Sequence, residues 1–296
     1  MLHARQDDGG LSEFEFYKYQ PSLVAAIICV VAFFIITTIH IYQMFRTRTW
    51  FMIAFCIGGI FETVGYVGRA ASAAQDADAY TLGPYIIQSI LLLVAPALFA
   101  ASIYMELARI VLLVDGDHAL LIRRRWLTRI FVSGDVLSFL VQASGGGLLA
   151  ASSDSVRTGE NLILVGLALQ IIIFGFFVIA GAIFHFRIRK APTLKSQSLP
   201  YQKHMWSLYG VSILIFIRSI VRLIEYAQGY SGYILSREWY LYVFDALLMF
   251  AAMAIMSYIH PSEVKALIRG GGKAARNFIF FREVKEGGQV QMMQTV

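Results

Sequence analysis

Seven long apolar stretches, separated by charged connections, constrain the fold of this chain more than any other feature. The first, residues 21–45, has no charged side chain in 25 residues, and a helix of that length crosses the roughly 30 Å hydrocarbon core of a bilayer. Only 15% of all residues are charged, against about 25% in soluble domains. The sequence therefore predicts an all-α integral membrane protein, a bundle of seven transmembrane helices at residues 21–45, 49–73, 84–113, 130–150, 161–186, 204–227 and 239–260.

The basic residues predict an orientation for this bundle. Of the 25 Lys and Arg residues, 17 follow the first, third, fifth and seventh stretches, and four lie on the opposite side. Since positive charge stays on the cytosolic side, we expect an extracellular N-terminal segment (1–20), a transmembrane domain (21–260) and a cytosolic tail (261–296) with a flexible break at Gly270–Gly272. The basic surplus then reflects topology and attraction to anionic lipid, and no nucleic-acid partner is expected.

The sixth stretch carries two arginines and a glutamate inside a strongly apolar run. Arg218, Arg222 and Glu225 are spaced i, i+4 and i+7, so they share one helical face. A charge that faces lipid at the bilayer centre costs at least about 2.5 kcal/mol, so this face must meet the bundle interior, a partner or water. We expect Arg222 to pair with a carboxylate, either Asp245 in the seventh stretch or Glu62 in the second.

The predicted topology also gives the other charges within the stretches a depth. Arg69 and Asp245 join the sixth-stretch charges near the outer side, and Glu62 lies near the middle of the membrane. The group nearer the cytosol comprises Glu106, Arg109 and Asp135. Two interpretations carry equal weight: structural ion pairs, such as Glu106 with Arg109 at i, i+3, or a polar cavity that binds an amphipathic substrate or relays protons.

Histidines and cysteines give weaker signals. Interfacial polar side chains are the favoured explanation for five histidines at the predicted cytosolic ends, and a metal or haem site is the alternative. These five are His40, His118, His185, His204 and His260. No tight ligand spacing such as His-Glu-x-x-His and no phosphate-binding loop is present, so no cofactor is expected. Cys29 and Cys56 fall at different depths of neighbouring helices, too far apart to bridge.

Short motifs in most of the stretches give the chain a family resemblance. They are Glu62, Tyr66 and Arg69; Gln88, Pro96 and Tyr104; Asp135 and Gln142; Gln170; Arg218, Arg222 and Glu225; and Glu238, Tyr242, Asp245, His260 and Pro261. In order and helix placement the chain resembles the fungal lipid-translocating exporters, the RTA-like proteins named for aminocholesterol resistance. The resemblance covers about Phe16 to Pro261, and it departs from the family at Val221, where a tyrosine is common.

The resemblance implies a membrane transporter, not an enzyme. Such a protein exports or flips an amphipathic lipid of the sphingoid-base type, or a lipophilic toxin, and confers resistance. Its partners are membrane lipids or lipophilic small molecules, and the plasma membrane is its expected location, with an endomembrane as the alternative. A receptor or stress sensor without transport and a metal-dependent intramembrane lipid hydrolase stay open as alternative functions. The oligomeric state and the substrate are not predicted.

The predicted polar site combines residues from most of the stretches. Arginines would meet an anionic headgroup, and carboxylates would meet a sphingoid amine. The site comprises Glu62, Arg69, Arg218, Arg222, Glu225 and Asp245, with Glu106 and Asp135 on the cytosolic route. Glu62, as the most central acid, is the candidate for a carboxyl whose protonation is linked to substrate release. A permanently ionised pair between Glu62 and an arginine is the equally weighted alternative.

Overall fold

The computed structural model describes residues 19–75, 81–151, 156–228, 232–234, 236–276, 279–286 and 289–294. Long helices form most of it, close to the predicted stretches: α1 (Leu23–Thr47), α2 (Ile53–Ala73), α3 (Leu82–Leu113), α4 (Arg124–Ala151), α5 (Val156–Lys190) and α7 (Tyr201–Ala227). The last membrane-length element joins α8 (Glu238–Leu241), the π-helical turn η4 (Tyr242–Leu247) and α9 (Leu248–Tyr258). Short helices lie between and after them: η1 (Trp50–Met52), η2 (Asp117–Ala119), α6 (Leu194–Ser198) and α10 (Ser262–Ile268).

Six of these helical segments are long and apolar enough to cross a membrane, so the chain is a multi-pass integral membrane protein. They are Leu23–Thr47, Trp50–Ala73, Gly83–Leu113, Arg157–Lys190, Tyr201–Ala227 and Glu238–Ile268. The predicted fourth stretch corresponds to α4, which is long enough but less apolar because it contains Asp135 and three successive glycines. The helical membrane fold is confirmed, whereas the count of seven crossings stays a prediction.

Capping residues fix where α1 begins and ends. The Ser22 hydroxyl accepts a hydrogen bond from the Ala25 N–H (3.4 Å), which satisfies one of the free donors at the helix start. At the other end Arg48 adopts a left-handed conformation (φ 54°), and its N–H donates to the carbonyls of Met44 and Phe45. Two residues therefore separate the end of α1 from η1, which leads into α2.

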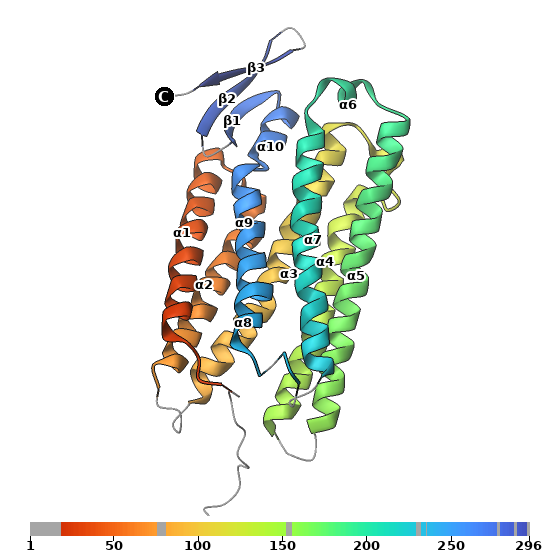
Figure 1. The fold of residues 1–296 in the computed structure, drawn as a ribbon. Helices are drawn as coiled ribbons and strands as arrows, with labels where there is room; N and C mark the ends of the chain where they lie inside the picture. The colour runs from red at the N-terminus through yellow and green to blue at the C-terminus, as the bar shows by residue number, and fades with distance from the viewer. Residues whose placement is uncertain are drawn as a thin grey trace, which may run out of the picture.

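Helix α3 lies at the centre of the bundle. It packs against α2, α4, α7 and α10, while α1 and α9 complete one side and α5 covers α4 and α7 on the other. Figure 1 shows the start of α1 at one end of the bundle and the C-terminal strands at the other. These are called the N-terminal end and the C-terminal end below.

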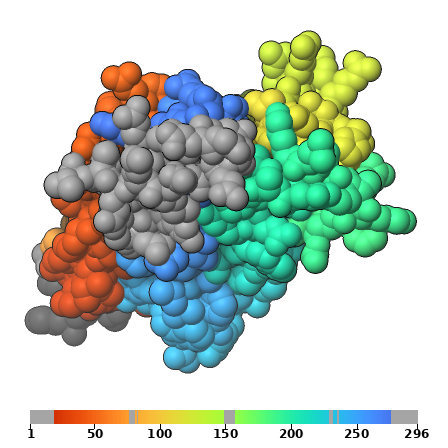
Figure 2. Space-filling model, turned by 90° about the horizontal axis from the view of Figure 1, so that it is seen from above, coloured from red at the N-terminus to blue at the C-terminus, as the bar shows by residue number. Residues whose placement is uncertain are grey.

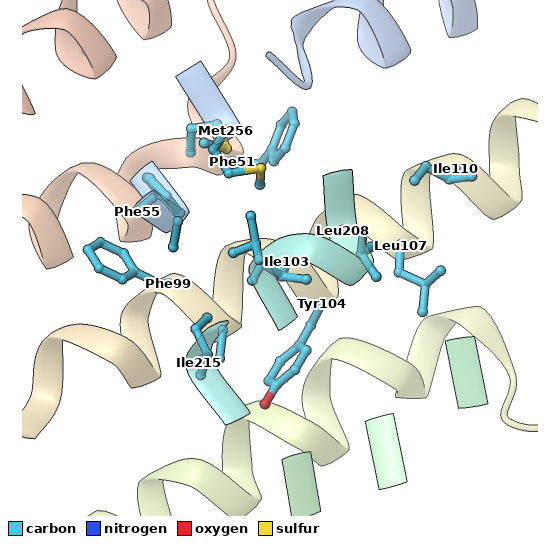
Figure 3. Close-up of a cluster of buried hydrophobic side chains, with 14 of the residues drawn as sticks. Phe51, Phe55, Phe99, Ile103, Tyr104, Leu107, Ile110, Leu208, Ile215 and Met256 are labelled. Atoms are coloured by element: carbon cyan, nitrogen blue, oxygen red, sulfur yellow. The ribbon is translucent and has the colours of Figure 1, made fainter. Parts of the chain in front are cut away.

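The interior is filled mainly by aromatic and aliphatic side chains from η1, α2, α3, α7 and α9 (Figure 3). The rings of Phe55 and Phe99 lie 4.5 Å apart between centroids, and those of Tyr104 and Phe177 are equally close. Large apolar side chains also cover the outside, where Val24 of α1 is 69% exposed. Such a surface suits contact with lipid tails, and helix association then depends on close packing.

Small residues let α4 and α5 approach each other closely. A Cβ atom at Gly145 would lie 2.6 Å from the carbonyl oxygen of Gly159, and one at Gly166 would lie 2.9 Å from that of Ser138. Of the three successive glycines in α4, Gly146 and Gly147 face open space. Of these three glycines, Gly145 alone therefore lies in the close contact between the helices.

The C-terminal segment packs on the bundle and forms structure that was not predicted. An antiparallel sheet of order β1-β2-β3 consists of β1 (Gly271–Arg276), β2 (Ile279–Glu286) and β3 (Gln289–Gln294). Ser262 Oγ in α10 accepts from the Ala275 N–H (2.9 Å), and Lys265 Nζ donates to the Thr47 carbonyl (3.1 Å). The expected flexible break is instead a turn at Gly270 (φ 74°) that leads into β1. Figure 2 views this end, with α1 in red-orange across from the α3–α4 connection in yellow.

Candidate functional site

Two arginines of α7 converge on one carboxylate of the π-helical turn near the N-terminal end. Arg218 Nε donates to Asp245 Oδ1, and Arg222 Nη2 donates to Asp245 Oδ2 over 3.1 Å. Arg218 Nη2 also donates to the carbonyl oxygen of Leu92 in α3 (2.5 Å). Asp245 therefore uses both oxygens, and the contacts join α3, α7 and η4.

A second acid balances the charge of this group. Arg222 Nη1 donates to Glu225 Oε2, three residues on in the same helix, over 3.1 Å. Two arginines and two carboxylates give no formal net charge, which allows the group to lie in a bundle interior. The Arg218–Asp245 pair is the drier part, with side chains 3% and 4% exposed. The prediction that Arg222 pairs with Asp245 or Glu62 is confirmed for Asp245.

The π-helical turn places neighbouring side chains in different networks. In a regular α-helix Glu238, Tyr242 and Asp245 would share one face at i, i+4 and i+7. Here Tyr242 and Glu238 bind Arg69 of α2, while Asp245 binds the arginines of α7. Such turns are often found at functional sites. No local sequence signal pointed to this one.

Arg69 is the centre of a separate network that closes the N-terminal end. Its guanidinium donates to Glu238 Oε1 (2.8 Å) and to the hydroxyls of Tyr19 and Tyr242 (3.0 Å each). Glu238 Oε1 also accepts from the Ser22 N–H (2.8 Å). Arg69 is only 1% exposed and ties α2 to α8 and to the segment before α1. The structure thus places Arg69 at the same end of the bundle as the Arg218–Asp245 pair but in its own network, with Glu238 as its acid.

Glu62 of α2 is fully buried, and within the described residues neither of its carboxyl oxygens makes a hydrogen bond. One turn further on, the buried hydroxyl of Tyr66 is also unbonded in the described part of the chain. The Tyr66 ring stacks between Phe33 (5.4 Å) and Tyr242 (6.4 Å). The alternative of a fixed Glu62–arginine pair is therefore not what the structure has.

A small pocket opens beside the Arg218–Asp245 pair. Its volume of about 30 Å³ holds a few waters and is too small for the headgroup of a lipid, so this conformation is closed. Its lining combines charged side chains with aromatic and aliphatic ones, a composition that matches an amphipathic ligand. The lining residues are Arg218, Arg222, Glu225, Arg237 and Asp245, with Tyr19, Tyr240, Phe244, Val221, Ile234 and Leu241. Sequence reasoning missed Arg237 and the aromatic wall, because they come from a connection and a turn with no motif of their own.

The two acids predicted for the cytosolic route lie nearer the C-terminal end and do not join the pocket. Asp135 Oδ2 in α4 accepts from the Tyr104 hydroxyl of α3 (2.8 Å). Glu106 is fully buried, with no hydrogen bond to its oxygens in the described residues. The proposed neutralisation of Glu106 by Arg109 is wrong, because the Arg109 guanidinium lies over the Phe51 ring (4.0 Å).

Three of the five histidines predicted at one level are buried together near the C-terminal end. The rings of His40 and His260 lie 6.4 Å apart, and His204 Nδ1 lies 3.9 Å from Glu106 Oε1. His185 instead bonds to the Tyr209 hydroxyl (3.1 Å), and His118 is exposed. Across the described ranges no three His, Cys, Asp or Glu side chains come together in the way that a metal ion needs.

Comparisons with known proteins give a consistent result. The family model described as RTA1 like protein matches residues 55–266. Protoporphyrin uptake protein 1 of Saccharomyces cerevisiae is 39% identical over 83% of this chain and 93% of its own length. Protein RTA1 of the same yeast is 38% identical (84% and 85% covered), and its sphingoid long-chain base transporter RSB1 is 30% identical (81% and 72%). No solved structure matches significantly.

Proposed function

This chain belongs to the RTA1-like protein family, and we propose that it moves an amphipathic lipid or a lipophilic small molecule across its membrane. The relatives named for a transported compound carry a porphyrin in one case and a sphingoid base in the other. Both compounds combine a large apolar body with charged groups. The proposed activity is transport and not catalysis.

The pocket at the N-terminal end is the observation that supports this proposal most directly. Its charged residues already form pairs with one another, so a bound headgroup would exchange contacts and not add an uncompensated charge. An anionic headgroup would take over a guanidinium from Glu225, whereas an amine would take over the carboxylate from Arg222. Tyr240 and Phe244 would meet the apolar body of either ligand.

The path through the bundle would begin at this pocket and continue past Glu62. Protonation of Glu62 is proposed to accompany substrate release, because the carboxyl is buried, unbonded within the described residues, and close to the paired arginines. Asp135 and Glu106 would lie further along the route, toward the C-terminal end. We also propose seven crossings, an extracellular N-terminus and the plasma membrane as the location.

Flux measurements with purified protein in liposomes test the transport proposal. A fluorescent sphingoid base and protoporphyrin would each be followed with and without an imposed proton gradient. We expect at least one of them to cross faster than in protein-free liposomes. If a ligand binds but does not cross, a receptor function replaces transport. If neither binds nor crosses, the proposal fails for both classes.

A pair of arginine variants tests the pocket itself. Arg237→Gln removes an exposed cation that lines the pocket, and Arg157→Gln removes an exposed cation at the same end outside it. We expect Arg237→Gln to slow the flux of an anionic substrate roughly fivefold, the value of about 1 kcal/mol for an exposed ionic contact. Arg157→Gln should leave the flux unchanged. Equal effects of the two variants would remove the pocket from the proposed route.

A further inference from the structure

A second buried polar group lies at the C-terminal end, well away from the pocket. His204 of α7 stands between two carboxylates: its Nδ1 is 3.9 Å from Glu106 Oε1 in α3, and its Nε2 is 3.5 Å from Glu263 Oε2 in α10. The other oxygen of Glu263 accepts from Lys203 Nζ. These four residues, called the histidine–glutamate cluster below, come from three helices that are distant in sequence.

The cluster is almost fully dry. Glu106 and His204 are 0% exposed and Glu263 is 1% exposed, whereas the Lys203 side chain is 22% exposed. Within the described residues Glu106 has no hydrogen bond to either oxygen. An ionised carboxylate in such a place is strongly disfavoured unless a cation faces it. Among the described residues, the only group within 4 Å that can supply one is the imidazole of His204.

Counting charges shows what the cluster needs. Lys203 and Glu263 form an ion pair and cancel each other. Glu106 and His204 remain, and one proton makes them neutral together, either on the carboxyl or on the imidazole of an ion pair. Without that proton the dry interior would hold an uncompensated negative charge.

In the part of the chain that the structure describes, the neighbouring elements place no fixed charge within ion-pair distance of Glu106 that would replace the proton. His260 Nδ1 accepts from the Ser262 N–H (3.2 Å), and His40 Nε2 contacts the Met253 carbonyl (2.9 Å). The other titratable groups on packed elements are turned to different partners: Arg109 to the Phe51 ring, Lys265 to the Thr47 and Arg48 carbonyls, and His185 to Tyr209.

We propose that Glu106 and His204 form a proton-binding site that is reached from the C-terminal end of the bundle through Glu263 and Lys203. The partly exposed Lys203 marks the solvent end of this route, and the fully buried Glu106 marks its inner end. Glu263 connects the two ends of the route because it contacts both Lys203 and His204. The ligand is a hydrogen ion, which needs no cavity.

The inference goes beyond the proposed transport and does not depend on it. If transport is coupled to protons, the site supplies an acid at the end of the bundle opposite the pocket, on the helix next to that of Glu62. If the protein does not transport, Glu106 and His204 still bind a proton. The two proposals can therefore fail separately.

Infrared difference spectroscopy of the full chain in liposomes tests the site without any substrate. A pH step should change the C=O stretching bands of protonated carboxylic acids, and Glu106→Gln should remove the component of that change that belongs to Glu106, whatever component Glu62 contributes. His204→Gln takes away the cation that faces the ionised carboxylate, so the midpoint of the band should move up by about one pH unit or more. Glu160→Gln, a half-buried acid of α5 at the opposite end, should leave the band and its midpoint as they are.

Each outcome decides the proposal. Loss of one band component in Glu106→Gln together with the upward midpoint of that component in His204→Gln supports it. A pH-induced change that is the same in Glu106→Gln as in the unaltered protein, or a midpoint that His204→Gln does not move, overturns it. If Glu106→Gln does not fold, the His204→Gln midpoint decides alone. Absence of flux in the liposome assay with the expected infrared result would end the transport proposal and leave the proton site standing.

Discussion

Asp245 accepts from both Arg218 and Arg222, so two of the ion pairs at the N-terminal end depend on this one side chain. Removing it would leave two buried guanidinium groups without their shared acid. Desolvation makes such an unpaired charge far more costly than the pair itself is stabilising. The contribution of Asp245 to the stability of the protein therefore follows from its burial and from its two partners.

We expect Asp245→Ala to lower the free energy of unfolding by about 3–5 kcal/mol, the usual cost of breaking a buried ion pair. Glu225→Ala is the matched control, since Glu225 pairs with Arg222 of the same helix and both side chains are about 15% exposed. Glu225→Ala should lower the free energy of unfolding by only about 1 kcal/mol. Unfolding in detergent, followed by intrinsic fluorescence, measures both variants. Equal losses would mean that the Asp245 pairs are solvated.

For Glu62 we expect the opposite result, because its carboxyl makes no hydrogen bond to any described residue that a substitution would break. Glu62→Gln resembles the protonated acid, so the protein should fold with its midpoint temperature unchanged while coupled flux loses its pH dependence. Glu238→Gln, which breaks the pair with Arg69, should lower the midpoint temperature. Unfolding of Glu62→Gln would instead indicate a fixed ion pair, and unchanged pH dependence would remove Glu62 from the mechanism.

At the scale of helices, the close approach of α4 and α5 rests on individual glycines. A methyl group at Gly166 would meet the Gln142 side chain at 2.5 Å and the Ser138 carbonyl at 2.9 Å. The backbone carbonyl cannot swing away as a side chain can, so the two helices would have to separate. The hydrogen bond from Gln142 Nε2 to Gln170 Oε1 (3.1 Å) crosses the same interface and would lengthen with it.

Gly166→Ala should therefore destabilise the protein by about 1–3 kcal/mol, as overpacking of a close interface does. Gly146→Ala is its control in α4, because nothing lies within 4 Å of a Cβ atom there. That change should be neutral or slightly stabilising, since alanine favours a helix over glycine by up to about 1 kcal/mol. Thermal unfolding of the two variants in the same detergent compares them. A harmless Gly166→Ala would show that α4 and α5 are further apart than this structure has them.

At the scale of the whole molecule, the distribution of basic residues predicts the orientation of the chain in the membrane, which the packing of the helices does not determine. The 17 cations on one side against four on the other predict a cytosolic C-terminus. An epitope tag after Val296 should resist protease added to intact cells, and a tag before Met1 should be removed. Digestion of the C-terminal tag from outside would contradict the predicted orientation and the seven crossings together.

The sequence by itself determined the membrane class and the positions of the long helices, because length and hydropathy are local properties of each stretch. It also determined that Arg218, Arg222 and Glu225 share a face, since helical periodicity fixes that without any neighbour. The same reasoning limited the partners of Arg222 to two acids. The RTA-like resemblance, carried by short motifs in order, was confirmed by the family match.

Only the tertiary structure decided which side chains meet across helices. The rotation of each helix and the π-helical turn assign Asp245 to the arginines of α7, assign Glu238 to Arg69, and leave Glu62 unbonded within the described residues. His204 meets Glu106 because α3 and α7 pack together, and it meets Glu263 because α10 folds back on the bundle. These contacts join residues about 100 and about 60 positions apart and leave no periodic trace in the sequence. Hydropathy predicts how deep a residue lies in the membrane. Which residues it contacts depends on the direction in which its side chain points around the helix axis, and the packing of the helices sets that direction.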